Sequence, residues 1–163
     1  MSEEMTFEEL LNRDGHLAFT NKGVSMMPLL RQGKDVMLIR KKGPERCKRL
    51  DAVLFRRPRR GKEQDAYVLH RILRINPDGS YWIVGDNCVT GDTVRADQVI
   101  GILTGVVRGK RTIRVTDPEY RLYVNTWCRW YRVRIFLLKA RNFIKRGAKR
   151  TLRRFSGQGK AAR

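Results

Sequence analysis

The chain has 163 residues, enough to bury a core, and its 41% apolar and 32% charged residues indicate a globular protein rather than a disordered one. A formal net charge of +20 predicts an anionic partner or surface, such as nucleic acid, acidic lipid or acidic protein. Three widely spaced cysteines without a CxxC pair argue against a disulfide framework and a zinc site, so we expect no metal and no cofactor. The longest apolar run, residues 99–107, is about half of what a membrane span needs, so no membrane span is expected.

The predicted elements begin with a short amphipathic helix over residues 5–12, where Thr6 and Glu9 have capping-box spacing. Turn signals then separate six β-like runs: DVMLIR, DAVLFRR, AYVLHRILRI, SYWIVGD, VIGILTGVV and TIRVT. This pattern predicts a mainly β fold, a compact antiparallel barrel-like or sandwich-like domain. The expected organisation is a helical segment over 1–20, a β domain over 21–116, a basic aromatic helical extension over 117–155 and a disordered tail over 156–163.

One serine lies in a setting that suggests chemistry. Ser25 follows Gly23 and precedes an extended run, but a serine hydroxyl needs a neighbour that accepts its proton. His70 is the better placed of two histidines, since it lies within a predicted strand. A lone histidine on such a strand is most often an ordinary core residue. The segment GDNCVTGD supplies Asp86 and Asp92 near that strand, although both are also common turn formers.

Four segments in order, GVSMMPLL, DAVLF, YVLHRIL and GDNCVTGD, resemble the type I signal peptidases and the related self-cleaving repressor peptidases. The resemblance covers about residues 21–107 and is closest to the archaeal and endoplasmic-reticulum branch. It implies a serine endopeptidase in which Ser25 is the nucleophile and His70 the general base. Asp92 would orient the imidazole and raise its pKa, so that activity is low in acid and rises toward neutral pH.

The same resemblance implies roles for further residues. The substrate would dock as an added β-strand on residues 66–69 and be cleaved after a small residue, with contacts from Met26, Tyr67, Val68 and Leu69. Gly85, Asp86 and Asn87 would structure their own loop, Asp86 through hydrogen bonds to backbone. Family members often carry a hydroxyl residue where this chain has Gly23, so one oxyanion donor is missing.

The chain also departs from both branches of that superfamily. No apolar anchor precedes the serine segment, and no Ala-Gly or Cys-Gly pair offers the repressors' cleavage site. A stand-alone peptidase domain is therefore expected. A second hypothesis is a weak or inactive peptidase fold that binds an anionic membrane or nucleic acid.

The segment over residues 120–155 mixes aromatic residues with arginine and lysine, and no acidic residue follows Glu119. Three interpretations remain open: a membrane-surface helix, which we favour, a nucleic-acid arm, or a helix packed on the β domain. Arg134, Arg141 and Lys145 are expected to interrupt its apolar side. The favoured interpretation gives a cytoplasmic protein, peripheral on the inner face of the membrane.

Overall fold

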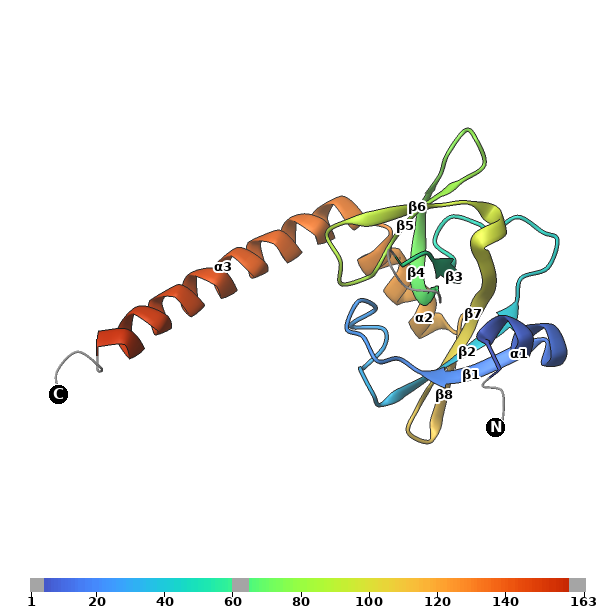
Figure 1. Ribbon diagram of the computed structural model, residues 1–163, viewed down its shortest axis with the longest axis horizontal. Helices are drawn as coiled ribbons and strands as arrows, with labels where there is room; N and C mark the ends of the chain where they lie inside the picture. The colour runs from blue at the N-terminus through green and yellow to red at the C-terminus, as the bar shows by residue number, and fades with distance from the viewer. Residues whose placement is uncertain (1–4, 60–64, 159–163) are drawn as a thin grey trace.

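An antiparallel sheet of eight strands forms the body of the protein, and helices occur near both ends of the chain (Figure 1). The computed structural model describes residues 5–59 and 65–158. The elements are α1 (Phe7–Asp14), β1 (His16–Thr20), β2 (Asp35–Lys41), β3 (Ala52–Arg57), β4 (Ala66–Ile75), β5 (Tyr81–Val84), β6 (Gly91–Val94), the 3-10 turn η1 (Ala96–Gln98), β7 (Val99–Arg108), β8 (Arg111–Arg114), α2 (Pro118–Tyr123), the π-helix η2 (Val124–Cys128) and α3 (Tyr131–Gln158).

The strands follow the order β1-β2-β7-β3-β4-β5-β6, and β8 pairs with β7 outside this path. Each pairing is antiparallel. The mainly β fold expected from the sequence is therefore confirmed. Within the described ranges no pairing joins β1 to β6, so the sheet has two ends.

Six of the strands coincide with the six predicted runs, and two were missed. The expectation that residues 1–20 form a helical segment is wrong for its last five residues, because His16–Thr20 is strand β1, paired with β2. Helix α1 lies where expected, and Thr6 and Glu9 form the capping box. Phe7 of α1 packs on Phe19 of β1 with ring centroids 4.5 Å apart, which fixes the helix on the sheet.

Two apolar clusters make up the core and position the segments that carry the candidate site. The first contains Met26, Leu29 and Leu30, all from the turn that carries Ser25. The second contains Phe55, whose ring centroid lies 6.1 Å from that of His70. The serine turn and the histidine strand are therefore both held by the core.

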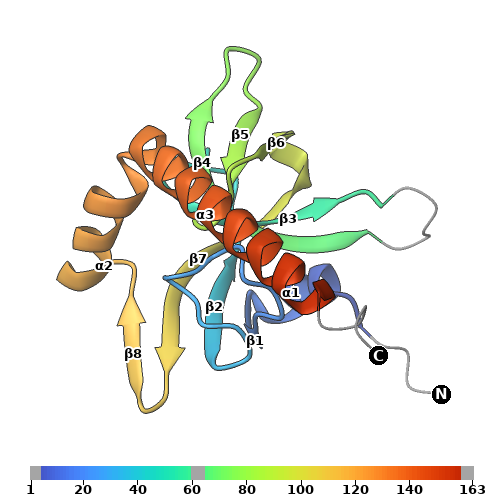
Figure 2. The ribbon, with the colours of Figure 1, turned by 90° about the vertical axis from the view of Figure 1, so that its left-hand side faces the viewer.

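The helical extension is present, and it ends in one long helix. Figure 1 shows α3 running outward from the β domain, and Figure 2 shows it crossing in front of the sheet. Of the tail expected to be disordered, residues 156–158 end α3, and residues 159–163 lie outside the described part of the chain. None of the helices that the structure describes has the length and apolarity that a membrane crossing requires.

Candidate active site

Ser25 lies half-buried in the turn between β1 and β2, and buried groups fix the turn. Asp35, fully buried at the start of β2, accepts hydrogen bonds from the guanidinium groups of Arg31 and Arg108. Burial alone would raise the pKa of Asp35, but these bonds hold it well below its usual range. Arg108 also donates to the Leu29 carbonyl at 2.7 Å, so the turn is tied to strand β7.

The loop after β5 holds the other side of the serine turn. The Asn87 backbone N–H donates to the Ser25 carbonyl at 2.7 Å, and its side-chain amide donates to the Val24 carbonyl at 3.1 Å. Asn87 therefore structures this region, but it does so by joining two loops rather than by bracing its own.

Gly85 is the point at which the candidate groups meet. A Cβ atom added to Gly85 would lie 2.7 Å from the Ser25 carbonyl oxygen, 2.8 Å from Cys88 Sγ and 2.9 Å from His70 Nε2. The Ser25 backbone and the His70 imidazole therefore lie within about 6 Å of each other, on either side of a residue that has no side chain. The structure thus brings the backbone of Ser25 close to the imidazole of His70, although 45 positions separate the two residues in the sequence.

His70 lies on β4 with 6% of its surface exposed. Its Nε2 atom faces Gly85 and the serine turn, whereas its Nδ1 atom is buried and has no hydrogen-bond partner among the described residues. Burial, with a further contribution from the Arg57 charge, lowers the pKa of His70 to about 4. The raised pKa expected from the sequence is therefore wrong, because these two effects outweigh the opposing influence of Asp92.

Asp92 lies close enough for its charge to favour the protonated form of His70, but its carboxylate is hydrogen-bonded to Arg57 rather than to His70. On β6, opposite Ile83 of β5, its carboxylate accepts from the Arg57 guanidinium. No hydrogen bond joins Asp92 to His70 in the part of the chain that the structure describes. Of the predicted triad, the backbone of Ser25 lies near His70, whereas Asp92 is paired with Arg57, a residue that the sequence did not single out.

Asp86 forms the centre of a buried ion cluster. Its carboxylate accepts two hydrogen bonds from Arg71, at 2.9 and 2.7 Å, and one from the Tyr123 hydroxyl at 2.9 Å. Arg134 of α3 lies 3.4 Å away, and all three charged residues are at most 2% exposed. Burial would raise the pKa of Asp86, but the Arg71 charge lowers it below its usual range.

Asp86 was expected to bond to the backbone of its own loop, and this prediction is corrected. Its carboxylate binds side chains from β4, α2 and α3, because two buried guanidinium groups require a counter-charge. A signal was available in the sequence: strand alternation places Arg71 on the same face as the apolar Leu69 and Leu73, where an arginine needs a buried partner.

A hollow of about 670 Å³ opens beside Ser25. Its lining includes Tyr67, Val68 and Leu69, three of the four expected substrate contacts. The fourth, Met26, is instead 1% exposed and packs in the core, so the structure does not support its assignment. Strand β4 pairs with β3 from Ala66 to Arg71 but with β5 only from Arg71 onward, so the 66–70 segment has one unpaired edge among the described strands.

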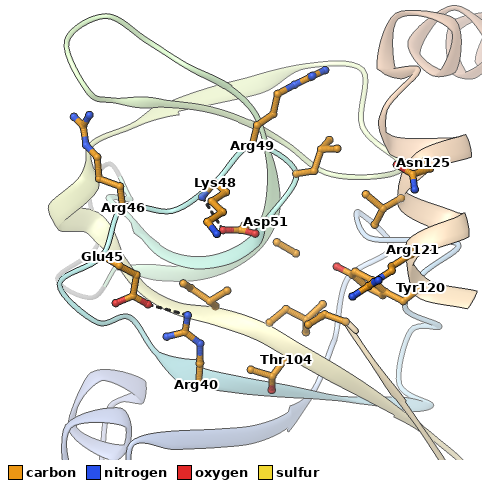
Figure 3. Close-up of a pocket in the computed structure, with 16 residues that line it drawn as sticks. Arg40, Glu45, Arg46, Lys48, Arg49, Asp51, Thr104, Tyr120, Arg121 and Asn125 are labelled. Carbon is orange, nitrogen blue, oxygen red and sulfur yellow. Dashed lines mark hydrogen bonds and ion pairs between the residues drawn. The ribbon is translucent and has the colours of Figure 1, made fainter. Parts of the chain in front are cut away.

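A second hollow, of about 460 Å³, is lined by different residues and contains none of the predicted site residues (Figure 3). Its lining includes Arg46, Arg49 and Arg121 together with Leu103 and Tyr120. Within the described residues no cluster of histidine, cysteine and acidic side chains could hold a metal ion. No protein-family model, curated protein or solved structure matches the chain.

Proposed function

We propose that the protein is a serine endopeptidase that uses Ser25 as nucleophile and His70 Nε2 as general base, on a barrel-like domain of the signal-peptidase type. The observation that carries the proposal is the close approach of the Ser25 backbone carbonyl and His70 Nε2 around Gly85. Two loops and two core clusters fix that approach, and orientation of this kind is a large part of what an enzyme supplies.

The mechanism follows from the groups at the site. His70 Nε2 accepts the Ser25 proton as Oγ attacks the substrate carbonyl, and the imidazolium later protonates the leaving amine. The Ser25 backbone N–H donates to no acceptor within the described residues, so it is free to bind the developing oxyanion. The acyl-enzyme is then hydrolysed by water activated in the same way.

The unpaired edge of β4 supports a mode of substrate binding. A peptide in extended conformation adds to residues 66–69 as a further strand, which leads its backbone toward His70. The adjacent hollow then receives its side chains, against Tyr67 and Leu69.

The test is covalent labelling by a fluorophosphonate together with cleavage of a peptide mixture that is rich in small residues. We expect the label on Ser25 and cleavage after small residues, and we expect both to be lost in Ser25→Ala and His70→Ala. Thr112→Ala is the matched control, because it removes an exposed hydroxyl from the β7–β8 hairpin that does not line the hollow beside Ser25. Full cleavage by Ser25→Ala would refute the proposal.

A second candidate is a catalytically weak peptidase fold whose role is binding at an anionic surface. The pairing of Arg57 with Asp92 favours it, since His70 Nδ1 is left without the carboxylate that orients the ring in a triad. An unlabelled Ser25 in a folded protein that still binds anionic vesicles or nucleic acid would favour this candidate over the peptidase.

A further inference from the structure

Helix α3 carries a row of large apolar side chains on its exposed side. They are Val133, Phe136, Leu137, Phe143 and Ile144, with exposed fractions of 52%, 69%, 50%, 80% and 68%. Their spacings of three, four and seven residues place them on one face of a helix. A monomeric protein rarely exposes so many large apolar side chains together, and such a row indicates a surface that binds something.

The opposite side of α3 faces the domain. Arg134 and Leu138 are each 2% exposed, and Arg134 reaches Asp86. Arg141 donates to Asn87 at 3.0 Å. Arg134 and Arg141 were expected to interrupt the apolar side, and both instead contact the domain; nothing is described of the Lys145 side chain. The exposed apolar row therefore lies on another side of the helix from Arg134 and Leu138, and Phe136 and Phe143 also line a hollow of about 490 Å³ together with Val89 of the loop after β5.

Cations flank the row. Arg132, Lys139 and Arg146 are exposed along the helix, and the chain contains no acidic residue after Glu119. Long cationic side chains can extend from the edge of an apolar face to phosphate groups, while the apolar face enters the acyl region of a lipid leaflet. The arrangement combines the two contacts that an anionic lipid surface offers.

Two other occupants fit the arrangement less well. A second copy of the chain would bring two strongly basic helices against each other, and the repulsion would oppose packing. Nucleic acid needs cations at the centre of its contact surface, whereas the centre of this face holds aliphatic and phenyl groups.

We propose that α3 is an in-plane membrane helix that binds the protein to an anionic lipid surface through the row Val133–Ile144. The inference does not depend on peptidase activity. Asn87 joins this helix to the serine turn, because it accepts a hydrogen bond from Arg141 and donates one to the Ser25 carbonyl. Docking would therefore place the Ser25 turn close to the lipid surface.

The experiment is cosedimentation of the full chain with vesicles of phosphatidylglycerol and phosphatidylcholine, or of phosphatidylcholine alone. We expect binding to the anionic vesicles that weakens with salt. The double variant Phe136→Ser with Phe143→Ser should bind at least about tenfold more weakly, since each phenyl side chain loses its apolar burial. Ile75→Ser, which changes an exposed apolar residue of the β4–β5 hairpin, should bind like the wild type.

Charge reversal separates a local effect from the effect of net charge. Lys139→Glu with Arg146→Glu should reduce vesicle binding more than Lys34→Glu with Lys110→Glu, which changes net charge equally at two exposed turn positions. Circular dichroism of each variant checks that the helix content is retained.

Three results would overturn the proposal. The first is no binding of the wild type to anionic vesicles at low salt. The second is a dimer in sedimentation velocity that the Phe136 and Phe143 changes dissociate. The third is binding to a single-stranded oligonucleotide that those changes abolish while vesicle binding persists.

Discussion

The low pKa of His70 predicts an acid destabilisation that one substitution should remove. Buried His70 has a pKa of about 4, against an ordinary value of 6.5 in the unfolded chain. The unfolded state therefore binds more protons between these two values. The neutral His70 side chain contributes its full stabilisation above pH 6.5, which is the pKa of histidine in the unfolded chain. This contribution is lost as the pH falls toward about 4, which is the pKa of His70 in the folded protein. The difference between the two pKa values corresponds to about 3 kcal/mol of unfolding free energy, which is lost when the pH falls from above the higher value to below the lower one.

The assay is urea unfolding followed by tryptophan fluorescence. From about pH 8 to about pH 5 the wild type should lose about 2 kcal/mol through this group. His70→Gln cannot be protonated and should lose correspondingly less over the same range, whatever its absolute stability. Buried Asp35 and Asp86 do not confuse the result, because their pKa values are lowered and their contribution declines only in stronger acid. Equal pH dependence of wild type and His70→Gln would refute the reasoning.

Two further substitutions test the geometry around the site. Gly85→Ala would place a methyl group less than 3 Å from the Ser25 backbone and His70 Nε2, so we expect at least about 100-fold lower kcat/KM in the peptide assay. Wild-type kinetics in this variant would contradict the close approach of the two residues. Asp86→Asn would leave the fully buried Arg71 without its counter-charge, so we expect the unfolding free energy, measured in urea, to fall by about 3–5 kcal/mol. A fall of less than about 1 kcal/mol would contradict the buried ion pair.

The sequence predicted those strands whose residues carry their own hydrophobic pattern. The six predicted runs all include apolar residues that the core buries, such as Val53 and Ile72. Strands β1 and β6 were missed because each lies at an end of the sheet and pairs on one side only, so few of its residues are buried. In β6, Val94 alone is fully buried, and the Gly-Asp-Thr before it has the composition of a turn.

The sequence predicted the site residues that lie in recognisable local segments, but it did not predict the ion pairs between residues far apart in the chain. Ser25 and His70 could be named because each lies in a recognisable segment. The pairing of Arg57 with Asp92 joins the end of β3 to β6, and many other arginines of this basic chain could have made it. The pKa of His70 depends on that choice and on burial, so sequence reasoning reached the wrong direction.

One buried carboxylate connects the parts of the molecule to which separate roles are proposed. Asp86 binds Arg71, the residue next to His70 on β4, and Arg134 of α3, while the neighbouring Asn87 holds the Ser25 carbonyl. Moving α3 away would break the 3.4 Å contact between Arg134 and Asp86, and the Arg71–Asp86 pair would remain. The first turns of α3 are held to the domain by this contact, by the buried Leu138 side chain and by the hydrogen bond from Arg141 to Asn87.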